Sequence, residues 1–279
     1  MFDLMIFLRG LLMGAADVVP GVSGGTIAFI TGIYSRLVHS ISTLNFKFLS
    51  SFFAGQFKSS WKELKKNDFA LFVPLALGIG ISMFLFSGLV GFLLESYAAY
   101  AFSFFFGLIL ASALFMIKTT KRMKLEHYFF VAIGVATAYL ISGSSALAAN
   151  HSLPILFLSG AIAICAMILP GISGAFILLL LNQYQYVINA IHNLNFLVIG
   201  TFGVGAIAGL LSFSKLLDYF LRHQRKLTFS FLIGIMLGSL RIPWQNIISN
   251  DFISWIVLLL GIVGFVLVFT LESAFGKLK

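Results

Sequence analysis

The chain has 279 residues, of which 60% are hydrophobic and only 10% are charged. Soluble domains contain about 25% charged residues, so this composition excludes a soluble globular fold and predicts an all-α polytopic membrane protein. The net charge of +9 comes from basic clusters separated by long apolar stretches. That arrangement is typical of membrane topology and argues against a nucleic-acid-binding protein.

The first predicted element is a re-entrant helical hairpin over residues 1–45. Pro20 and Gly21 break its apolar sequence, because proline lacks an amide donor and disfavours helix in the residue before it. Ser23 follows at the position where the N-cap of a second helical arm is expected. We therefore expect the hairpin to turn back at this motif.

A basic loop over residues 47–68 links this hairpin to three predicted membrane spans. The loop is either an amphipathic helix at the lipid headgroups or a solvated connection. The spans lie near 69–94, 99–117 and 127–146. Each is about long enough to cross the hydrocarbon core as a helix.

The second half of the chain repeats this plan. The motif Pro20-Gly21-Val22-Ser23-Gly24-Gly25 returns 150 positions later as Pro170-Gly171-Ile172-Ser173-Gly174-Ala175, inside a second predicted hairpin over 154–193. Further along, Phe102-Ser103-Phe104 returns 127 positions later as Phe229-Ser230-Phe231. The remaining predicted spans lie near 196–221, 227–241 and 253–272. Such repeats are common in transporters, and we expect one membrane domain, 1–279, with repeat halves 1–150 and 151–279.

The basic clusters set the expected topology. They occupy Lys47–Lys66, Lys118–Lys124, Lys215–Lys226 and the C-terminal Lys277-Leu278-Lys279, whereas the loops between them lack Lys and Arg. Basic loops face the cytoplasm, and only hairpins that enter and leave by one face keep every cluster there. The first hairpin then opens to the cytoplasm and the second outward, both termini are cytoplasmic, and the halves form an inverted-topology repeat.

The repeated motif predicts an anion-binding site. A helix that starts within the membrane presents free N–H groups and a positive dipole end, which favour phosphate. The residues expected to hold the phosphate at the two motifs are Ser23, Gly24, Gly25, Thr26, Ser173 and Gly174. Pro20, Gly21, Pro170 and Gly171 are the expected helix breaks. The alternative is a compact turn whose small residues only allow close helix packing.

Four charged residues are further candidates. Asp17 ends the first arm, where it has either a structural role, as an ion pair with Arg9 or Arg36 or as a cap, or binds and releases a proton that couples to phosphate binding. Arg9 and Arg36 either neutralise phosphate from the cytoplasmic side or extend to the headgroups. Arg241 lies beside an otherwise neutral external loop, where it either receives a lipid phosphate or remains interfacial.

The run from Met13 to Tyr34, with the second Leu169-Pro170-Gly171-Ile172-Ser173-Gly174, resembles the bacterial family of PopT-type polyprenyl-phosphate translocases. The resemblance covers essentially the whole chain. It implies a flippase of the bacterial cytoplasmic membrane that moves undecaprenyl phosphate from the outer to the inner leaflet for reuse. The expected partners are this lipid and the bilayer, with a homo-oligomer left open.

Two other functions remain as alternatives. The motif is similar to the Pro-Gly-x-Ser-Arg-Ser element of undecaprenyl-pyrophosphate phosphatases, but Gly24 and Gly174 replace its arginine, and the chain has no Glu-x-x-x-Glu pair. The acid–base groups that a phosphatase needs are therefore lacking, and we expect no enzyme activity. A transporter of a small soluble anion is the second alternative. We expect no cofactor and no metal site, and alternating access driven by protons, another ion or the lipid's own gradient.

Overall fold

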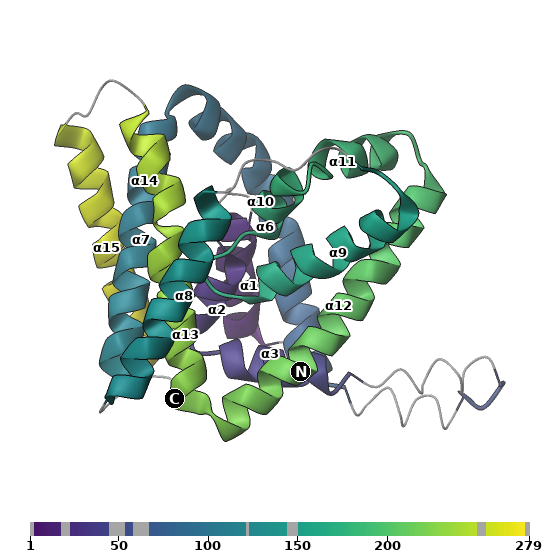
Figure 1. Cartoon of the computed structure of the whole chain (residues 1–279), viewed down its shortest axis with the longest axis horizontal. Coiled ribbons are helices and arrows are strands. Elements are labelled where there is room, and N and C mark those ends of the chain that lie inside the picture. The colour runs from purple at the N-terminus through teal and green to yellow at the C-terminus, as the bar shows by residue number, and fades with distance from the viewer. Residues whose placement is uncertain are drawn as a thin grey trace.

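The structure is a computed structural model that describes residues 3–17, 23–44, 54–57, 67–120, 123–143, 150–249 and 255–276. Every regular element in these ranges is a helix, as expected (Figure 1). The first-half helices are α1 (Leu4–Asp17), α2 (Gly24–Ile30), α3 (Tyr34–Ser42), α6 (Phe69–Ser96), α7 (Ala98–Thr119) and α8 (Leu125–Gly143). The second-half helices are α9 (Leu153–Ile168), α10 (Gly174–Leu180), α11 (Tyr184–His192), α12 (Phe196–His223), α13 (Arg225–Ser239), α14 (Arg241–Ile248) and α15 (Trp255–Gly276).

Five helical segments within the described residues are long and apolar enough to cross a membrane. They are Phe69–Phe86, Ala98–Lys118, Leu125–Gly143, Phe196–His223 and Arg225–Ile248. All five overlap predicted spans, and the sixth predicted span coincides with α15, whose apolar stretch Trp255–Val268 is shorter. The chain is therefore a multi-pass helical membrane protein.

One stretch differs from the expectation. The residues after 241 were predicted to form an external loop, but they form α14 directly after α13. Leu240 between the two helices keeps right-handed helical backbone angles, and Arg225–Ile248 forms one continuous apolar segment. The polar residues that made this stretch look like a loop lie on a short helix.

The helix boundaries follow the two sequence offsets. Helices α2 and α10 begin and end 150 positions apart, and so do α3 and α11. Helices α6 and α12 are offset by 127 positions at both ends, and they share a cap: the side chain of Asp68 accepts from Leu71 N–H, and that of Asn195 accepts from Val198 N–H. The repeat in the sequence is thus also a repeat of local structure.

Each predicted second arm is two helices rather than one. A turn separates α2 from α3, where Gly32 has φ 78°, and the equivalent turn before α11 has Asn182 at φ 54°. Glycine and asparagine are the residues that adopt this left-handed conformation most readily. The bend between α10 and α11 reaches 108°. Sequence reasoning did not anticipate this second break.

Helices from the two halves are interleaved. The most extensive contacts join α1 to α6, α9 to α12, α7 to α15 and α8 to α13, so the last two pairs each take one helix from each half. Glycines at repeat-related positions allow these pairs to approach closely. A Cβ on Gly107 would lie 1.9 Å from the carbonyl oxygen of Gly261, and one on Gly234 would lie 2.1 Å from that of Val131.

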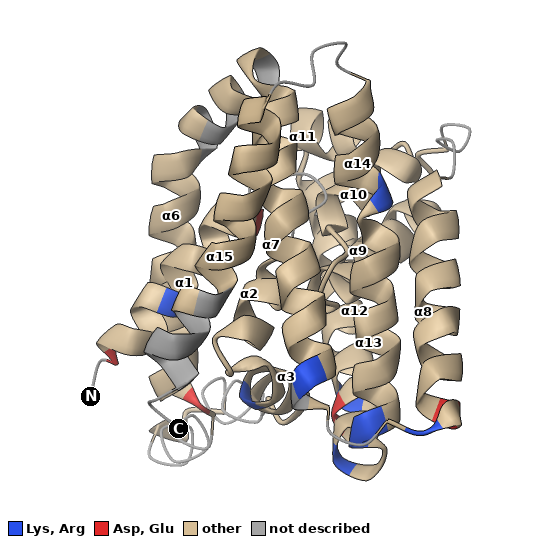
Figure 2. Ribbon diagram, turned by 90° about the vertical axis from the view of Figure 1, so that its left-hand side faces the viewer, with Lys and Arg blue, Asp and Glu red and all other residues tan. Residues whose placement is uncertain are grey.

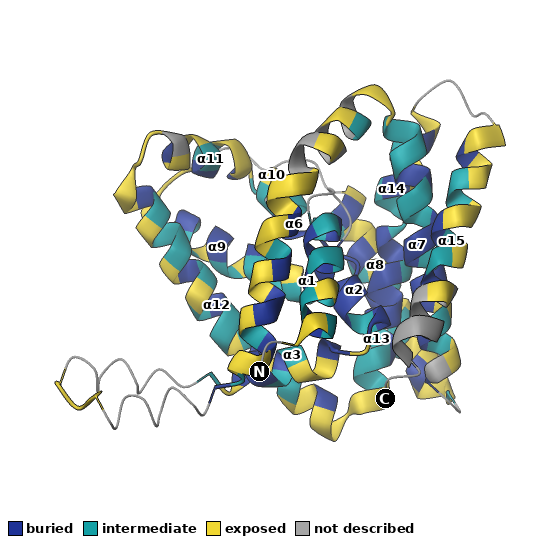
Figure 3. Cartoon of the chain, turned by 180° about the vertical axis from the view of Figure 1, so that it is seen from behind, coloured by how far each residue is buried: buried dark blue, intermediate teal, exposed yellow. Residues whose placement is uncertain are grey.

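Burial separates the inside of the molecule from its periphery. Buried residues concentrate where α2, α7, α8 and α13 meet, whereas α6, α12 and α15 present exposed faces (Figure 3). Those faces carry large apolar side chains such as Phe84, Val204 and Leu258, as expected for lipid contact. Lys and Arg gather at the end of the molecule that also holds α3 and both chain ends (Figure 2). We call this the basic end.

Candidate functional site

The first motif contacts the turn of the second motif near the centre of the bundle. Ser23 is 1% exposed and occupies the N-cap of α2, where its hydroxyl accepts from the amide of Gly25 at 3.1 Å. The same hydroxyl donates to the carbonyl oxygen of Leu169 at 3.1 Å and lies 3.4 Å from that of Met167. One side chain thus caps its own helix and binds the end of α9.

Two neighbouring residues complete this contact. The hydroxyl of Thr26, which is fully buried, accepts from the amide of Gly171 at 3.0 Å. A Cβ on Gly25 would lie 2.9 Å from the carbonyl oxygen of Ile168, so the backbones of the two motifs nearly touch. The structure therefore brings Ser23, Gly25 and Thr26 against the second motif.

The amide at the start of α2 is occupied by a carboxylate of the chain itself. The amide of Gly24 donates to Asp17 Oδ1 at 2.6 Å, a short distance typical of a charged acceptor. Asp17 has no ion pair recorded among the described residues. The expected pairing with Arg36 is not observed, because that arginine is bound to Asp68. Asp17 thus occupies the place predicted for an anion.

The second motif starts its helix differently. Pro170 and Gly171 lie in the turn after α9, and Leu169 has the extended backbone that a following proline requires. Ser173 is the N-cap residue of α10, but its side chain makes no capping hydrogen bond. Gly174 is buried against α9, and Met167 stands at the position equivalent to Asp17. Pro20 and Gly21 of the first motif lie outside the described residues.

The three candidate arginines have different surroundings. Arg36 Nε and Nη2 donate to the two carboxylate oxygens of Asp68, both at 2.9 Å, and this ion pair holds the pKa of Asp68 below its usual range. Arg9 lies on α1 within the electrostatic influence of Asp3 and Arg36. The structure groups the motif residues but does not bring these arginines to them.

Arg241 is bound to α8. Its Nη1 donates to the carbonyl oxygen of Tyr139 at 3.0 Å, and its guanidinium lies 4.2 Å from the centre of the Tyr139 ring. Its guanidinium also packs against Gly143, where a Cβ would displace it. Both partners are uncharged, and among the described residues no carboxylate is recorded in an ion pair with Arg241.

A polar cluster that sequence reasoning missed lies at the basic end, and we call it the α3 latch. It consists of Arg36, His39, Ser40 and Ser42 on α3, with Asp68 before α6 and Asp218 and Arg222 on α12. Asp218 Oδ2 lies 3.2 Å from His39 Nδ1, 3.1 Å from the Ser42 hydroxyl and 3.1 Å from Arg222 Nε. A carboxylate inside an apolar span, four residues before an arginine, was the sequence signal that could have found it.

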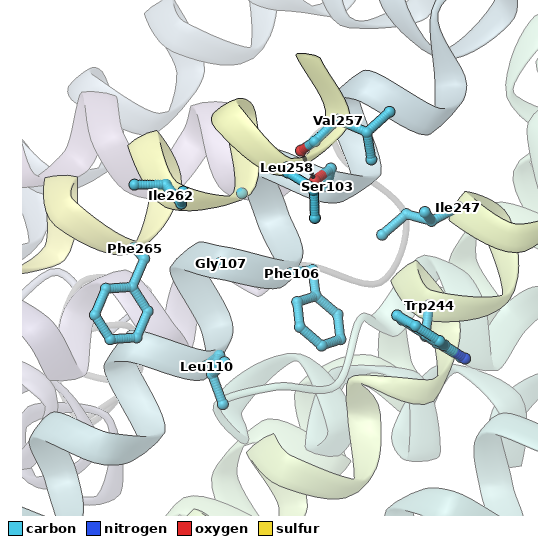
Figure 4. A pocket seen from close by; sticks show the side chains of 11 residues that line it. Ser103, Phe106, Gly107, Leu110, Trp244, Ile247, Val257, Leu258, Ile262 and Phe265 are labelled. Carbon is cyan, nitrogen blue, oxygen red and sulfur yellow. Dashed lines mark hydrogen bonds between the residues drawn. The ribbon is translucent and has the colours of Figure 1, made fainter. Parts of the chain in front are cut away.

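An apolar cavity of about 350 Å³ lies away from the motifs, between α7, α14 and α15 (Figure 4). Phe106, Trp244 and Phe265 are among its lining residues. The hydroxyl of Ser103 faces it but donates to the carbonyl oxygen of Val257, so it presents almost no polar surface. Its chemistry suits hydrocarbon and not a phosphate group.

Comparison with known proteins gives the family. The family model described as undecaprenyl phosphate translocase-like matches residues 13–268. This chain belongs to that family. A polyprenyl-phosphate transporter of Vibrio cholerae serotype O1 is 43% identical over 248 residues, covering 88% of this chain and 80% of the relative. A polyprenyl-phosphate transporter of Staphylococcus aureus is 33% identical over 288 residues, covering 97% and 96%. No solved structure matches the chain.

The matched region of this translocase-like family member includes both motifs and the whole α3 latch. Because the match runs from Met13 to Val268, it takes in Asp17, Asp68 and Asp218 but leaves out Arg9. Chemically, the motif contact offers amide and hydroxyl groups in a water-poor interior, together with one competing carboxylate. These amide and hydroxyl groups are all bonded to groups of the chain itself in this structure. Among the described residues, no cluster of His, Cys, Asp or Glu could hold a metal ion.

Proposed function

We propose that this protein is a flippase that moves undecaprenyl phosphate from the outer to the inner leaflet, so that the carrier lipid can be used again. The names of its two relatives and of its family support this substrate. The observation that carries the proposal is the contact between the motifs, in which Ser23 and Thr26 bind the backbone at Leu169 and Gly171. Polar groups from both halves therefore converge inside an otherwise apolar bundle.

The phosphate head binds at the starts of α2 and α10, while the isoprenyl chain stays in hydrocarbon. Moving a bare phosphate through the bilayer is very costly, and fixed amide and hydroxyl donors lower that cost. Ser23, Gly24, Gly25 and Thr26 supply these donors from the first motif, and Ser173 and Gly174 supply them from the second. The bond from Gly24 to Asp17 supports this assignment, because a carboxyl oxygen of the chain already accepts from one of these amides.

Asp17 couples phosphate binding to a proton. An ionised Asp17 both occupies the Gly24 amide and repels phosphate. Protonation weakens the hydrogen bond and removes the repulsion, so that the phosphate can take the place of the carboxylate. A proton and the lipid phosphate then bind together, which gives the coupled step that a transporter needs.

The two halves work as an inverted repeat in a single domain by alternating access. The matching helix bounds and the interleaved pairs α7–α15 and α8–α13 support this arrangement. The basic end, with both termini, faces the cytoplasm by the positive-inside rule. Arg9 and Arg36 serve the phosphate on this side, whereas Arg241, with its uncharged partners, receives it at the outer face.

The test is leaflet-resolved transport of undecaprenyl phosphate in proteoliposomes. We expect Ser23→Ala, Ser173→Ala and Asp17→Asn each to lower the rate. Ser159→Ala is the matched control. This buried serine lies in the second hairpin, as Ser173 does, but its hydroxyl donates to the carbonyl oxygen of Ile155 in its own helix. Hydrolysis of the pyrophosphate lipid and uptake of labelled inorganic phosphate are measured in the same vesicles.

The outcomes separate the three functions. Transport that needs the motif serines but not Ser159, without hydrolysis, supports the flippase. Phosphate release from the pyrophosphate lipid would instead indicate a phosphatase. Uptake of inorganic phosphate without lipid movement would indicate a transporter of soluble anions.

A further inference from the structure

The last helices of the two hairpins, α3 and α11, are packed differently. Helix α3 packs against α12 of the other half, in addition to its contact with α2. The repeat predicts an equivalent contact between α11 and α6, yet α11 packs on α10 and α12, and no extensive contact with α6 is recorded for the described residues. The structure is therefore asymmetric between two elements that the sequence relates.

Burial shows the same asymmetry at paired positions. Tyr34 on α3 is 2% exposed, whereas Tyr184, 150 positions later on α11, is 37% exposed. Ile41 is 9% exposed and its equivalent Ile191 is 50% exposed. Because the two residues of each pair are of the same type, their difference in exposure comes from their positions in the fold.

The α3 latch forms the polar part of the contact that α3 makes with α12 and with the start of α6. Asp218 on α12 binds His39 and Ser42, and Asp68 binds Arg36 and Ser40, so α3 is tied to both α12 and the start of α6. The repeat-related positions of Asp218, His39 and Asp68 hold Gly91, Asn189 and Asn195, which are uncharged. Among the described residues, ion pairs are recorded on α3 and none on α11.

We propose that the α3 latch is the gate at the basic end, and that the structure is the state closed at this end. The proposal deepens the proposed function, because an alternating-access flippase must separate α3 from α12 before a phosphate head can leave the motifs toward the basic end. The ionic contacts suit this task. A lipid phosphate gives Arg222 and Arg36 an alternative anionic partner, and such a differential contact is what shifts a two-state equilibrium.

A disulfide across the gate tests whether it must open. Ser42→Cys and Asp218→Cys are combined in a Cys165→Ser background, since the Ser42 hydroxyl lies 3.1 Å from Asp218. We expect oxidation to abolish transport of undecaprenyl phosphate and reduction to restore it. The two single-cysteine variants, which cannot form this bond, are the controls. Full transport by the oxidised double variant would overturn the proposal.

Hydrogen exchange tests the gate without any lipid and so does not depend on the transported substrate. Asp218→Asn keeps the shape of the side chain but removes its charge. We expect amides of α3 to exchange about 5–30-fold faster, because weakening one such contact raises the population of the open state by about this factor. The amides of α11 should exchange at the wild-type rate. Glu126→Gln, an exposed acid on α8, is the control. Equal exchange of α3 in Asp218→Asn and wild type would refute the gate even if the lipid assay succeeds.

Discussion

Thr26→Val tests the contact between the two motifs most directly. The substitution keeps the size and branching of a fully buried side chain but removes the oxygen that accepts from the Gly171 amide at 3.0 Å. This amide then has no partner in a water-free interior. A buried donor without an acceptor costs about 1–3 kcal/mol, because its hydration is lost and nothing replaces it.

The matched control is Thr31→Val in the same hairpin. Thr31 is also buried, but its hydroxyl donates to Ile27, whose carbonyl also accepts from the Thr31 amide, so no group is left unpaired. We expect this control to be close to neutral. Thermal melts in detergent should separate the two variants, since each kcal/mol shifts the melting temperature by about 2–4 °C in chains of roughly this size. Equal melting temperatures would show that the motifs are not held by this bond.

Three further outcomes are expected. Asp17→Asn should bind undecaprenyl phosphate more tightly than wild type but lose the pH dependence of transport, because the competing charge is gone; weaker binding would contradict the role of Asp17. Because Arg36 depresses the pKa of Asp68, their ion pair stabilises the protein above the usual pKa of about 3.9 and is lost as pH falls through the depressed value. The melting temperature of Asp68→Asn should therefore fall less than that of wild type as the pH is lowered through this range. Gly107→Ala should destabilise the α7–α15 pair by clashing with a backbone oxygen, whereas Gly203→Ala, which meets nothing within 4 Å, should be neutral or slightly stabilising.

The sequence predicted the class of protein and the positions of its spans, because membrane helices are determined largely by apolar length. It also predicted that Pro170 and Gly171 would interrupt a helix, since proline acts locally. It did not predict the turn at Gly32 or the helix from Arg241. Neither feature has a strong local signal, because a single glycine or a polar stretch is compatible with several backbone paths.

The candidate site was predictable in its parts but not in its contacts. Duplication of the motif indicated that Ser23 and Ser173 matter, and the structure places Ser23 against the second motif. The pairing of Arg36 with Asp68 instead of Asp17 depends on where α3 packs, and that is set by contacts between residues distant in sequence. The α3 latch was missed for the same reason, since His39 and Asp218 are 179 positions apart.

The two motifs differ in sequence and the two hairpins differ in packing, and both differences distinguish the first hairpin from the second. The first hairpin carries Asp17, which accepts from the Gly24 amide, and also α3, which packs against α12 at the basic end. The second hairpin has Met167 in place of the carboxylate and an arm, α11, that is exposed. In the proposed cycle, a phosphate arriving from the outer face therefore meets no competing charge at the second motif. It meets Asp17 and then the latch only as it moves toward the basic end, so the steps that a proton controls and the step that opens the gate belong to the same hairpin.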